Sequence, residues 1–286
     1  MTTQRTWRWL VLFLLVDLVL VVVMFRHVSG DADDATANPT APGPVDSSEP
    51  VAPATPTAAG LVEATDDVVV WGERGTCSAG TPVVLARDVD GVRDELDPGM
   101  TELLRIDVND AGDVYVIGAD AQCQPVELLL SEGATDWVDP PGPIRRWHLT
   151  SGAGATVTTP VGDVDPGCAP VSFVSDGTEG LVACGNGAIR TSDDDGATWE
   201  GEVVLEGLRS AVRSDDGAWA LAPADDCAVA SYRVDAAEAG VTGCVTTEAG
   251  DGLVLLAASG DGYVAVVADR LLRSSDGSSW EPLPAP

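Results

Sequence analysis

Residues 61–286 repeat one short pattern, and this repeat limits the folds that the chain can adopt. Each copy has a short apolar strand, a tight turn of Asp, Asn, Ser and Gly, and a second apolar strand. The five copies are VEATDDVVVWG, IDVNDAGDVYVIG, SFVSDGTEGLVACG, AVRSDDGAWALA and AASGDGYVAVVA. Their second strands begin near Val68, Val114, Leu181, Trp219 and Tyr263, at intervals of 46, 67, 38 and 44 residues. Blades of a β-propeller recur every 40–45 residues or so, and three of the four intervals fit that spacing.

Further strands follow each pair. We expect third strands at 82–89, 125–132, 188–193, 228–234 and 270–275, and fourth strands at 199–204 and 280–283. A single blade leaves both of its faces uncovered, so blades must stack around an axis to bury them. We therefore predict an all-β fold, a small β-propeller of five or possibly six four-stranded blades within residues 61–286.

The longest interval leaves residues 142–167 outside the repeat. This stretch is either an inserted loop or the remains of a sixth blade, because insertions in repeat folds map to loops. A β-sandwich or an irregular barrel is the structural alternative, since both are also built from short strands separated by turns.

Two copies carry the same polar turn between their third and fourth strands. An Asp at such a turn accepts hydrogen bonds from backbone N–H groups, Gly supplies the unusual backbone angle, and Trp packs against the sheet. In SDDDGATWE the residues are Ser192, Asp194, Gly196, Thr198 and Trp199. In SSDGSSWEP they are Ser274, Asp276, Gly277, Ser279 and Trp280. A weaker copy, SEGATDW at 131–137, keeps Ser131, Gly133 and Trp137 but has no Asp at the turn.

These turns resemble the Asp box, or BNR repeat, of sialidase-like β-propellers, whose pattern is Ser-x-Asp-x-Gly-x-Thr-Trp. The resemblance implies that each turn is a structural hairpin and that a ligand site lies on the other side of the blades. The sialidase motif Phe/Tyr-Arg-Ile-Pro is absent, and PIRRW at 143–147 has the wrong order. We therefore expect a non-enzymatic binding or scaffold module and assign no catalytic residue. A sialidase-like or other glycoside hydrolase is the alternative.

The segment IRRWHL gathers Arg145, Arg146, Trp147 and His148 in an otherwise acidic region. Arg and Trp are enriched among the residues that dominate binding energies at interfaces. The segment also lies in or beside the stretch outside the repeat, and loops of this kind often bind partners. We predict that these four residues form a binding loop for a protein or an envelope glycan. A strand with an inward Trp and ion-paired Arg residues is the structural alternative.

All six cysteines lie in the repeat region, and an even number outside the cytoplasm favours disulfides. The repeat places Cys77 and Cys123 after equivalent second strands of adjacent blades. It places the remaining four in two local pairs within single blades. We predict the disulfides Cys77–Cys123, Cys168–Cys184 and Cys227–Cys244.

The formal net charge of −31 makes nucleic acid an improbable partner, because the chain repels phosphate backbones. Two acidic turns, at 88–91 and 107–113, contain potential calcium ligands. Neither completes the twelve-residue calcium loop with its bidentate Glu, so we expect no metal and no cofactor.

The amino terminus carries an apolar run, LVLFLLVDLVLVVVMF at 10–25, preceded by Arg5 and Arg8. With its flanks, residues 10–28 are nearly long enough to cross a bilayer. The positive charges before the run place residues 1–9 in the cytoplasm and the rest outside. We predict an uncleaved, single-pass signal anchor in the cell membrane. A signal peptide cleaved near Val28-Ser29-Gly30 is the alternative.

Residues 29–60 are rich in Pro, Ala and Thr and have almost no large apolar side chain. Such a segment cannot bury enough surface to offset its chain entropy, so we expect a disordered spacer between the membrane and the propeller.

Overall fold

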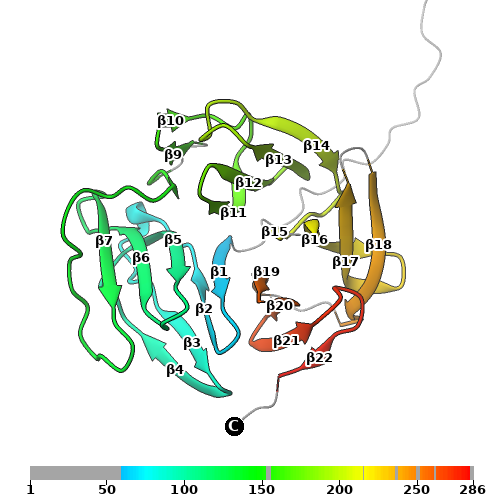
Figure 1. The fold of residues 1–286 in the computed structure, drawn as a ribbon, viewed down its shortest axis with the longest axis horizontal. Helices are drawn as coiled ribbons and strands as arrows, with labels where there is room; N and C mark the ends of the chain where they lie inside the picture. The colour runs from blue at the N-terminus through cyan, green and yellow to red at the C-terminus, as the bar shows by residue number, and fades with distance from the viewer. Residues whose placement is uncertain are drawn as a thin grey trace, which may run out of the picture. The chain divides into compact units, whose positions relative to one another are not determined.

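The computed structural model describes residues 59–152, 156–214, 216–235, 238–248, 252–260 and 262–283. Within these ranges six small antiparallel sheets surround one axis, as the blades of a β-propeller (Figure 1). This confirms the all-β prediction and decides for six blades over five. The predicted anchor at 10–28 and all but the last two residues of the predicted spacer lie outside the described residues. Over the ranges above, no helix has the length and apolarity that a membrane span requires.

The six sheets follow one another along the chain. Blade 1 contains β1 (Gly60–Ala64), β2 (Val68–Glu73), β3 (Leu85–Val89) and β4 (Val92–Leu96), with a 3₁₀ turn, η1 (Cys77–Ala79), after β2. Blade 2 contains β5 (Glu102–Val108), β6 (Val114–Ala119) and β7 (Pro125–Leu130), and blade 3 contains β8 (His148–Leu149), β9 (Val157–Thr159) and β10 (Gly162–Val164). Blade 4 contains β11 (Pro170–Asp176), β12 (Glu179–Cys184), β13 (Ala188–Ser192) and β14 (Glu200–Val204). Blade 5 contains β15 (Ser210–Ser214), β16 (Gly217–Ala224), β17 (Cys227–Asp235) and β18 (Glu238–Thr246). Blade 6 contains β19 (Val254–Ser259), β20 (Gly262–Val267), β21 (Arg270–Ser274) and β22 (Glu281–Pro282).

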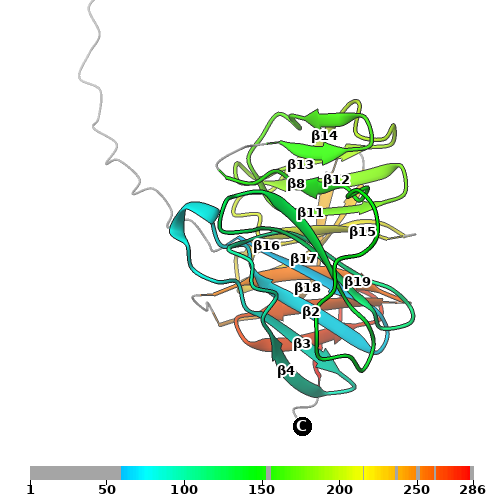
Figure 2. The same cartoon turned by 90° about the vertical axis from the view of Figure 1, so that its left-hand side faces the viewer.

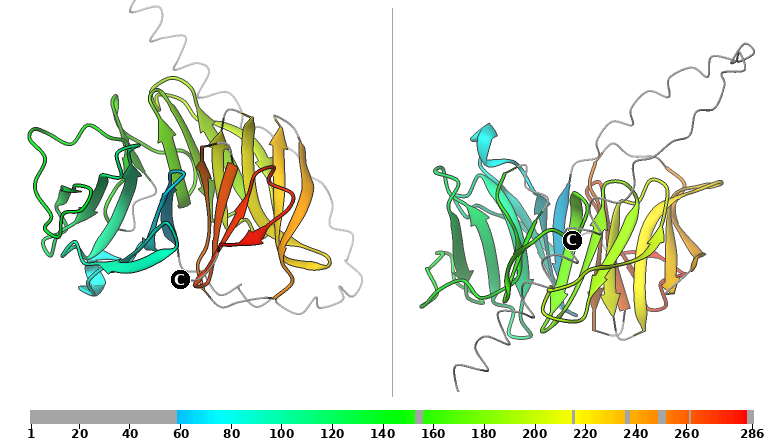
Figure 3. Two further views of the ribbon diagram at one scale, coloured as in Figure 1. Left: turned by 60° about the horizontal axis from the view of Figure 1, so that its bottom comes forward. Right: turned by 90° about the horizontal axis from the view of Figure 1, so that it is seen from above.

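Each full blade is a meander in which consecutive strands pair side by side. The strands run between the same two faces of the propeller (Figure 2, Figure 3). The second strands, such as β12 and β20, are buried along nearly their whole length because neighbouring blades cover both of their sides. This explains why they are continuous runs of Val, Leu and Ala rather than alternating apolar and polar residues.

The apolar core lies between neighbouring blades and forms four clusters. The largest joins blades 1 to 4, and the other three lie between blades 4 and 5, blades 5 and 6, and blades 6 and 1. Burial of both sheet faces is therefore achieved by stacking of blades, as the repeat predicted.

Blade 3 is incomplete, and this determines the shape of the propeller centre. Its strand β8 begins beside Arg146, which bonds Asp107 near the end of β5. It ends beside Thr150, whose carbonyl oxygen accepts a hydrogen bond from Arg74, and Arg74 pairs with Glu102 at the start of β5. β8 therefore runs opposite to β5 and occupies the place of a second strand. The first strand of this blade is missing, so residues 142–167 are the remains of a sixth blade.

The ring closes between blade 6 and blade 1 without a shared strand. The apolar cluster between these blades includes Trp71 and Leu255. Ser259 Oγ donates to Thr65 O at 2.7 Å, and Arg273 donates to Asp66 O at 2.8 Å. Side-chain hydrogen bonds and apolar contacts thus join the first and last blades, in place of a blade built from strands of both ends of the propeller.

The three predicted disulfides are present. Cys77–Cys123 links the loops after β2 and β6 in blades 1 and 2, while Cys168–Cys184 and Cys227–Cys244 lie within blades 4 and 5. The described part of the chain has no free cysteine.

The polar turn between β13 and β14 is held by its own Asp. Asp194 accepts from Thr198 N at 2.9 Å and from Thr198 Oγ at 2.7 Å, and it accepts from Ser192 Oγ at 3.0 Å. These donors, led by the backbone of Thr198, lower the pKa of Asp194. Gly196 has φ 81° and would place a Cβ 2.5 Å from Thr159 of blade 3. The turn therefore packs tightly on the preceding blade.

The turn between β21 and β22 repeats this arrangement. Asp276 accepts from the backbone N–H groups of Ser278 and Ser279, both at 2.9 Å. Gly277 O accepts from Ser231 Oγ of blade 5 at 2.6 Å, and a Cβ on Gly277 would lie 2.3 Å from the Trp219 ring. Both turns stabilise contacts between blades, as their resemblance to structural hairpins implied. Their assignment to the Asp-box family remains a prediction.

Candidate functional site

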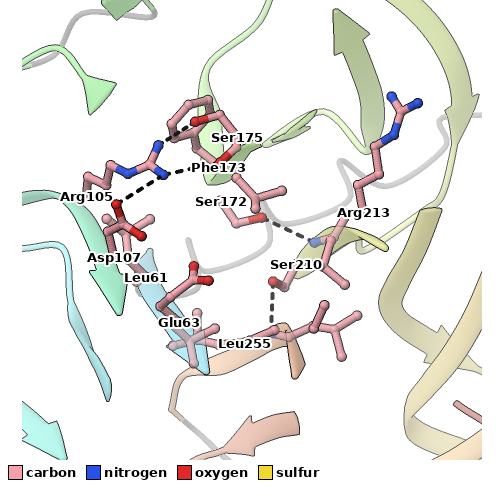
Figure 4. Close-up of a pocket in the computed structure, with 18 of the residues that line it drawn as sticks. Leu61, Glu63, Arg105, Asp107, Ser172, Phe173, Ser175, Ser210, Arg213 and Leu255 are labelled. Carbon is pink, nitrogen blue, oxygen red and sulfur yellow. Dashed lines mark hydrogen bonds and ion pairs between the residues drawn. The ribbon is translucent and has the colours of Figure 1, made fainter. Parts of the chain in front are cut away.

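The innermost strands of the five complete or nearly complete blades surround a channel cavity of about 240 Å³ (Figure 4). These strands are β1, β5, β11, β15 and β19. Most of the wall is apolar or small, but five charged side chains line it. Arg213 is paired with Glu179 at 3.0 Å, and the other four, from blades 1, 2 and 4, are Glu63, Arg105, Asp107 and Asp176. We call these four residues the channel site.

Glu63 projects its carboxyl group into this cavity from β1 (Figure 4). Among the described residues it has no hydrogen-bond partner. Enclosure by protein raises the pKa of Glu63 from 4.5 to about 8, opposed by Arg105 and reinforced by Asp107 and Asp176. At neutral pH this carboxyl group is therefore mostly protonated and uncharged.

Arg105 crosses the gap left by the missing strand of blade 3. Its guanidinium donates to Trp147 O at 3.0 Å and to Ser175 O at 3.2 Å, and it also bonds Ser175 Oγ. Asp107 Oδ2 lies 3.9 Å from Arg105 Nη2. Burial lowers the pKa of Arg105, and the nearby carboxyl groups oppose this shift. Arg105 thus joins blades 2 and 4 where an inner strand would normally do so.

A second cavity of about 310 Å³ adjoins the channel at this gap. It shares Arg105, Asp107 and Asp176 with the channel and adds Arg145 and Arg146 to the wall. We call this space the side cavity.

The two arginines that line only the side cavity differ in their hydrogen bonds and ion pairs. Arg146 donates to Asp107 at 2.7 Å, pairs with Glu127, and lies 3.9 Å over the ring of Tyr115. Arg145 is exposed, and no ion pair or hydrogen bond joins it to the described residues. Arg145 is therefore the side chain at this mouth that is free to meet a ligand.

The other two residues of the predicted binding loop are not available for contact. Trp147 is 4% exposed and packs edge-on against Trp199 at 6.3 Å. His148 is 6% exposed, its Nδ1 lies 2.9 Å from Arg146 O, and burial lowers its pKa. The prediction that Trp147 and His148 contact a ligand directly is therefore corrected. Both side chains are buried and support the loop, as the structural alternative described for the Trp.

The side cavity also lies on an unexpected side of the blades. Its wall includes Asp176 and Gly177, at the turn between β11 and β12. The polar turn of Asp194 lies on this same side, since Asp195 N donates to Thr178 O at 3.0 Å. The side cavity beside IRRWHL therefore lies on the same side of the blades as this turn, whereas the resemblance implied a ligand site on the other side.

A larger cavity of about 830 Å³ lies where the inner strands begin. At its base Glu102 is fully buried, but its carboxylate accepts from Ser151 Oγ at 2.8 Å, Gly152 N at 2.9 Å and Arg74 at 3.2 Å. Because every one of these donors comes from blade 1 or blade 3, Glu102 acts as a structural tie between blades. We therefore place the candidate site in the channel, where the enclosed carboxyl lacks such partners.

Sequence reasoning missed all four residues of the channel site. A signal was present, because the first strand of a blade faces the axis and should contain small or apolar residues. Glu63, Arg105 and Asp107 interrupt this pattern within their first strands. Within the described residues, no group of three or more His, Cys, Asp or Glu side chains is arranged to hold a metal ion.

No protein-family model matches the sequence, and no curated protein matches it. Among solved structures, the chain is similar to the SapL1 lectin in complex with alpha methyl fucoside, with 11% identity, a TM-score of 0.48, and coverage of 80% of this chain and 95% of that one. It is similar to AofleA from Arthrobotrys oligospora, with 11% identity, a TM-score of 0.47, and coverage of 78% and 84%. It is also similar to the Aleuria aurantia lectin in complex with Fucalpha1-6GlcNAc, with 10% identity, a TM-score of 0.48, and coverage of 80% and 96%.

Proposed function

We propose that the protein is a membrane-anchored, extracytoplasmic binding module of the Asp-box propeller type, without enzymatic activity. Residues 10–28 anchor it, residues 29–60 act as the spacer, and the propeller recognises a protein or an envelope glycan. The ligand meets Arg145 at the side cavity and extends to Glu63 in the channel.

The observation that carries this proposal is the carboxyl of Glu63. It is enclosed, has no hydrogen-bond partner in the described chain, and has a pKa raised to about 8. Such a group costs stability at neutral pH, where an apolar or small residue would serve the fold better. Side chains that reduce stability and line a cavity are typical of functional sites.

The proposal is tested with the full-length protein in detergent micelles. Binding to a glycan array and to envelope protein extracts is compared for the wild type, Arg145→Ala and Arg270→Ala. Arg270 is a matched control because it is also an exposed arginine, on β21 and paired only with surface groups. We expect Arg145→Ala alone to reduce binding. Equal binding by all three proteins would contradict the proposed site.

A glycoside hydrolase is the second candidate, and one observation favours it. A carboxyl group with a raised pKa close to a second carboxyl group is the arrangement that glycosidases use for acid and base catalysis. Glu63 would be the acid, and Asp107 or Asp176 the carboxylate. Release of chromophore from a panel of aryl glycosides by the wild type, lost in Glu63→Gln, would establish the hydrolase and refute the non-enzymatic proposal.

A further inference from the structure

The channel site has a carboxyl group that the protein itself does not use. We propose that the channel binds an organic ammonium group of the ligand, with Glu63 as its carboxylate partner. This inference rests on the proposed binding function and names the chemistry of the group that reaches the channel.

No hydrogen-bond donor that lines the channel bonds Glu63 among the described residues. Arg105 directs its donors at Trp147 O and at the backbone and side chain of Ser175, and none of these bonds is to Glu63. The other polar contacts around the channel join neighbouring blades: Ser172 Oγ accepts from Ala211 N, and Ser210 Oγ accepts from Leu256 N. Glu63 is therefore left for a ligand.

The charges that face Glu63 favour a cation over an anion. From β5 come Arg105 and Asp107, and from β11 comes Asp176. Arg146 at the side cavity is balanced by Asp107 and Glu127, so its charge adds little. Together the two guanidinium groups of Arg105 and Arg146 face the carboxyl groups of Asp107, Glu127 and Asp176, so the balance of charge favours an arriving ammonium over an anion.

The remaining elements around the channel do not change this balance. Arg213 on β15 is paired with Glu179 at 3.0 Å. The residues of β19 that line the cavity, 255–258, carry no charge, and His148 on β8 is buried with a lowered pKa. No nearby group therefore offers an anion a free positive partner inside the channel.

Phe173 adds an independent reason for an organic cation. Its ring lines the same cavity from β11, close to the gap where Arg105 crosses (Figure 4). The face of an aromatic ring attracts cations, and this attraction increases where water is partly excluded. A carboxyl group and a ring in one small cavity are suited to an alkylammonium, with the charge at the carboxylate and the methylene groups against Phe173.

Binding of this kind exchanges one proton with solvent. The neutral carboxyl of Glu63 loses its proton to water and becomes a carboxylate, which then pairs with the ammonium. The affinity for the cation therefore rises about tenfold for each pH unit between roughly pH 6 and pH 7, and it levels off above the pKa of about 8. A ligand that accepts a hydrogen bond from protonated Glu63 would show the opposite trend.

The test uses calorimetric titration of the full-length protein with n-butylammonium, n-butanol and butyrate at equal ionic strength. We expect only butylammonium to bind, with release of close to one proton at pH 7 when buffers of different ionisation enthalpy are compared. In Glu63→Gln the proton release and the pH dependence should disappear. Phe173→Leu should weaken binding but keep the proton release, which provides a second measurement should Glu63→Gln fold poorly.

Three results would overturn the inference: tighter binding of butanol or butyrate, binding of butylammonium without proton release, and no binding of any probe. None of these decides the proposed function, which depends on the effect of Arg145→Ala on capture of the ligand. If Arg145→Ala abolishes capture and the channel ignores butylammonium, the binding module stands and only the ammonium assignment fails.

Discussion

Replacing Glu63 by Gln should make the protein more stable at neutral and alkaline pH. The substitution keeps the shape and hydrogen-bonding capacity of the side chain but removes the carboxyl that is costly to ionise inside the channel. The prediction is informative because changes at a partly buried polar residue usually destabilise a protein. A gain would identify Glu63 as a residue retained for a purpose other than folding.

The pKa difference sets the sign and the size of this effect. Below pH 4.5 Glu63 is protonated in both the folded and the unfolded chain, so its ionisation does not affect stability. Between pH 4.5 and about 8 the unfolded chain ionises first, and the folded state loses about 1.4 kcal/mol per pH unit. The full shift would amount to about 5 kcal/mol, and because Glu63 is only partly buried, solvent screening should reduce the total to about 2–4 kcal/mol above pH 8.

The assay is urea unfolding of the full-length wild type, Glu63→Gln and Glu281→Gln between pH 4 and pH 9. Glu281 is an exposed carboxyl on the outer strand β22 and serves as the matched control. The wild type and Glu63→Gln should coincide near pH 4 and diverge as the pH rises, while Glu281→Gln follows the wild type. A difference that does not change with pH, or a wild type more stable than Glu63→Gln at pH 8, would refute the reasoning.

Three further predictions concern the contacts between blades. Glu102→Ala should lower the free energy of unfolding in urea by about 3–5 kcal/mol, because it leaves the largely buried guanidinium of Arg74 without its carboxylate partner. Glu95→Ala, on the exposed strand β4, should change it little. Gly277→Ala should lower the free energy of unfolding by about 2 kcal/mol or more and lower the melting temperature, because its Cβ would meet the Trp219 ring and its backbone φ is 69°. Gly240→Ala, with open space around the new Cβ, should have a smaller effect. Replacing the Cys77–Cys123 pair by Ser should cost about 4 kcal/mol, against about 3 kcal/mol for Cys168–Cys184, because the loops close over 46 and 16 residues. Equal losses for the two disulfides would contradict this entropic account.

Local patterns in the sequence predicted much of the fold. The second strands at Val68, Val114 and Leu181 stand out because neighbouring blades cover both of their faces, which requires continuous apolar runs. The polar turns at Asp194 and Asp276 stand out because each Asp bonds backbone groups only a few residues away. Cys77–Cys123 could be predicted because equivalent positions of adjacent blades lie close together in space, and the other two disulfides because each pair lies within one blade.

Residues 142–167 show where this reasoning ends. Their sequence allows an inserted loop or an eroded blade, because β8 has only two residues and leaves almost no periodic pattern. IRRWHL likewise looks like a surface segment rich in binding residues. Only packing against Trp199 and the core reveals that Trp147 and His148 are buried.

The sequence by itself determined the strand–turn–strand repeat, the polar turns and the disulfides of this protein, since these depend on contacts within one blade or between equivalent positions of adjacent blades. Only the tertiary structure decided where the channel site lies. Glu63, Arg105 and Asp176 come from blades 1, 2 and 4 and meet because the first strand of blade 3 is missing and the ring closes around the axis. The raised pKa of Glu63 follows from that enclosure, which no local pattern in the sequence encodes.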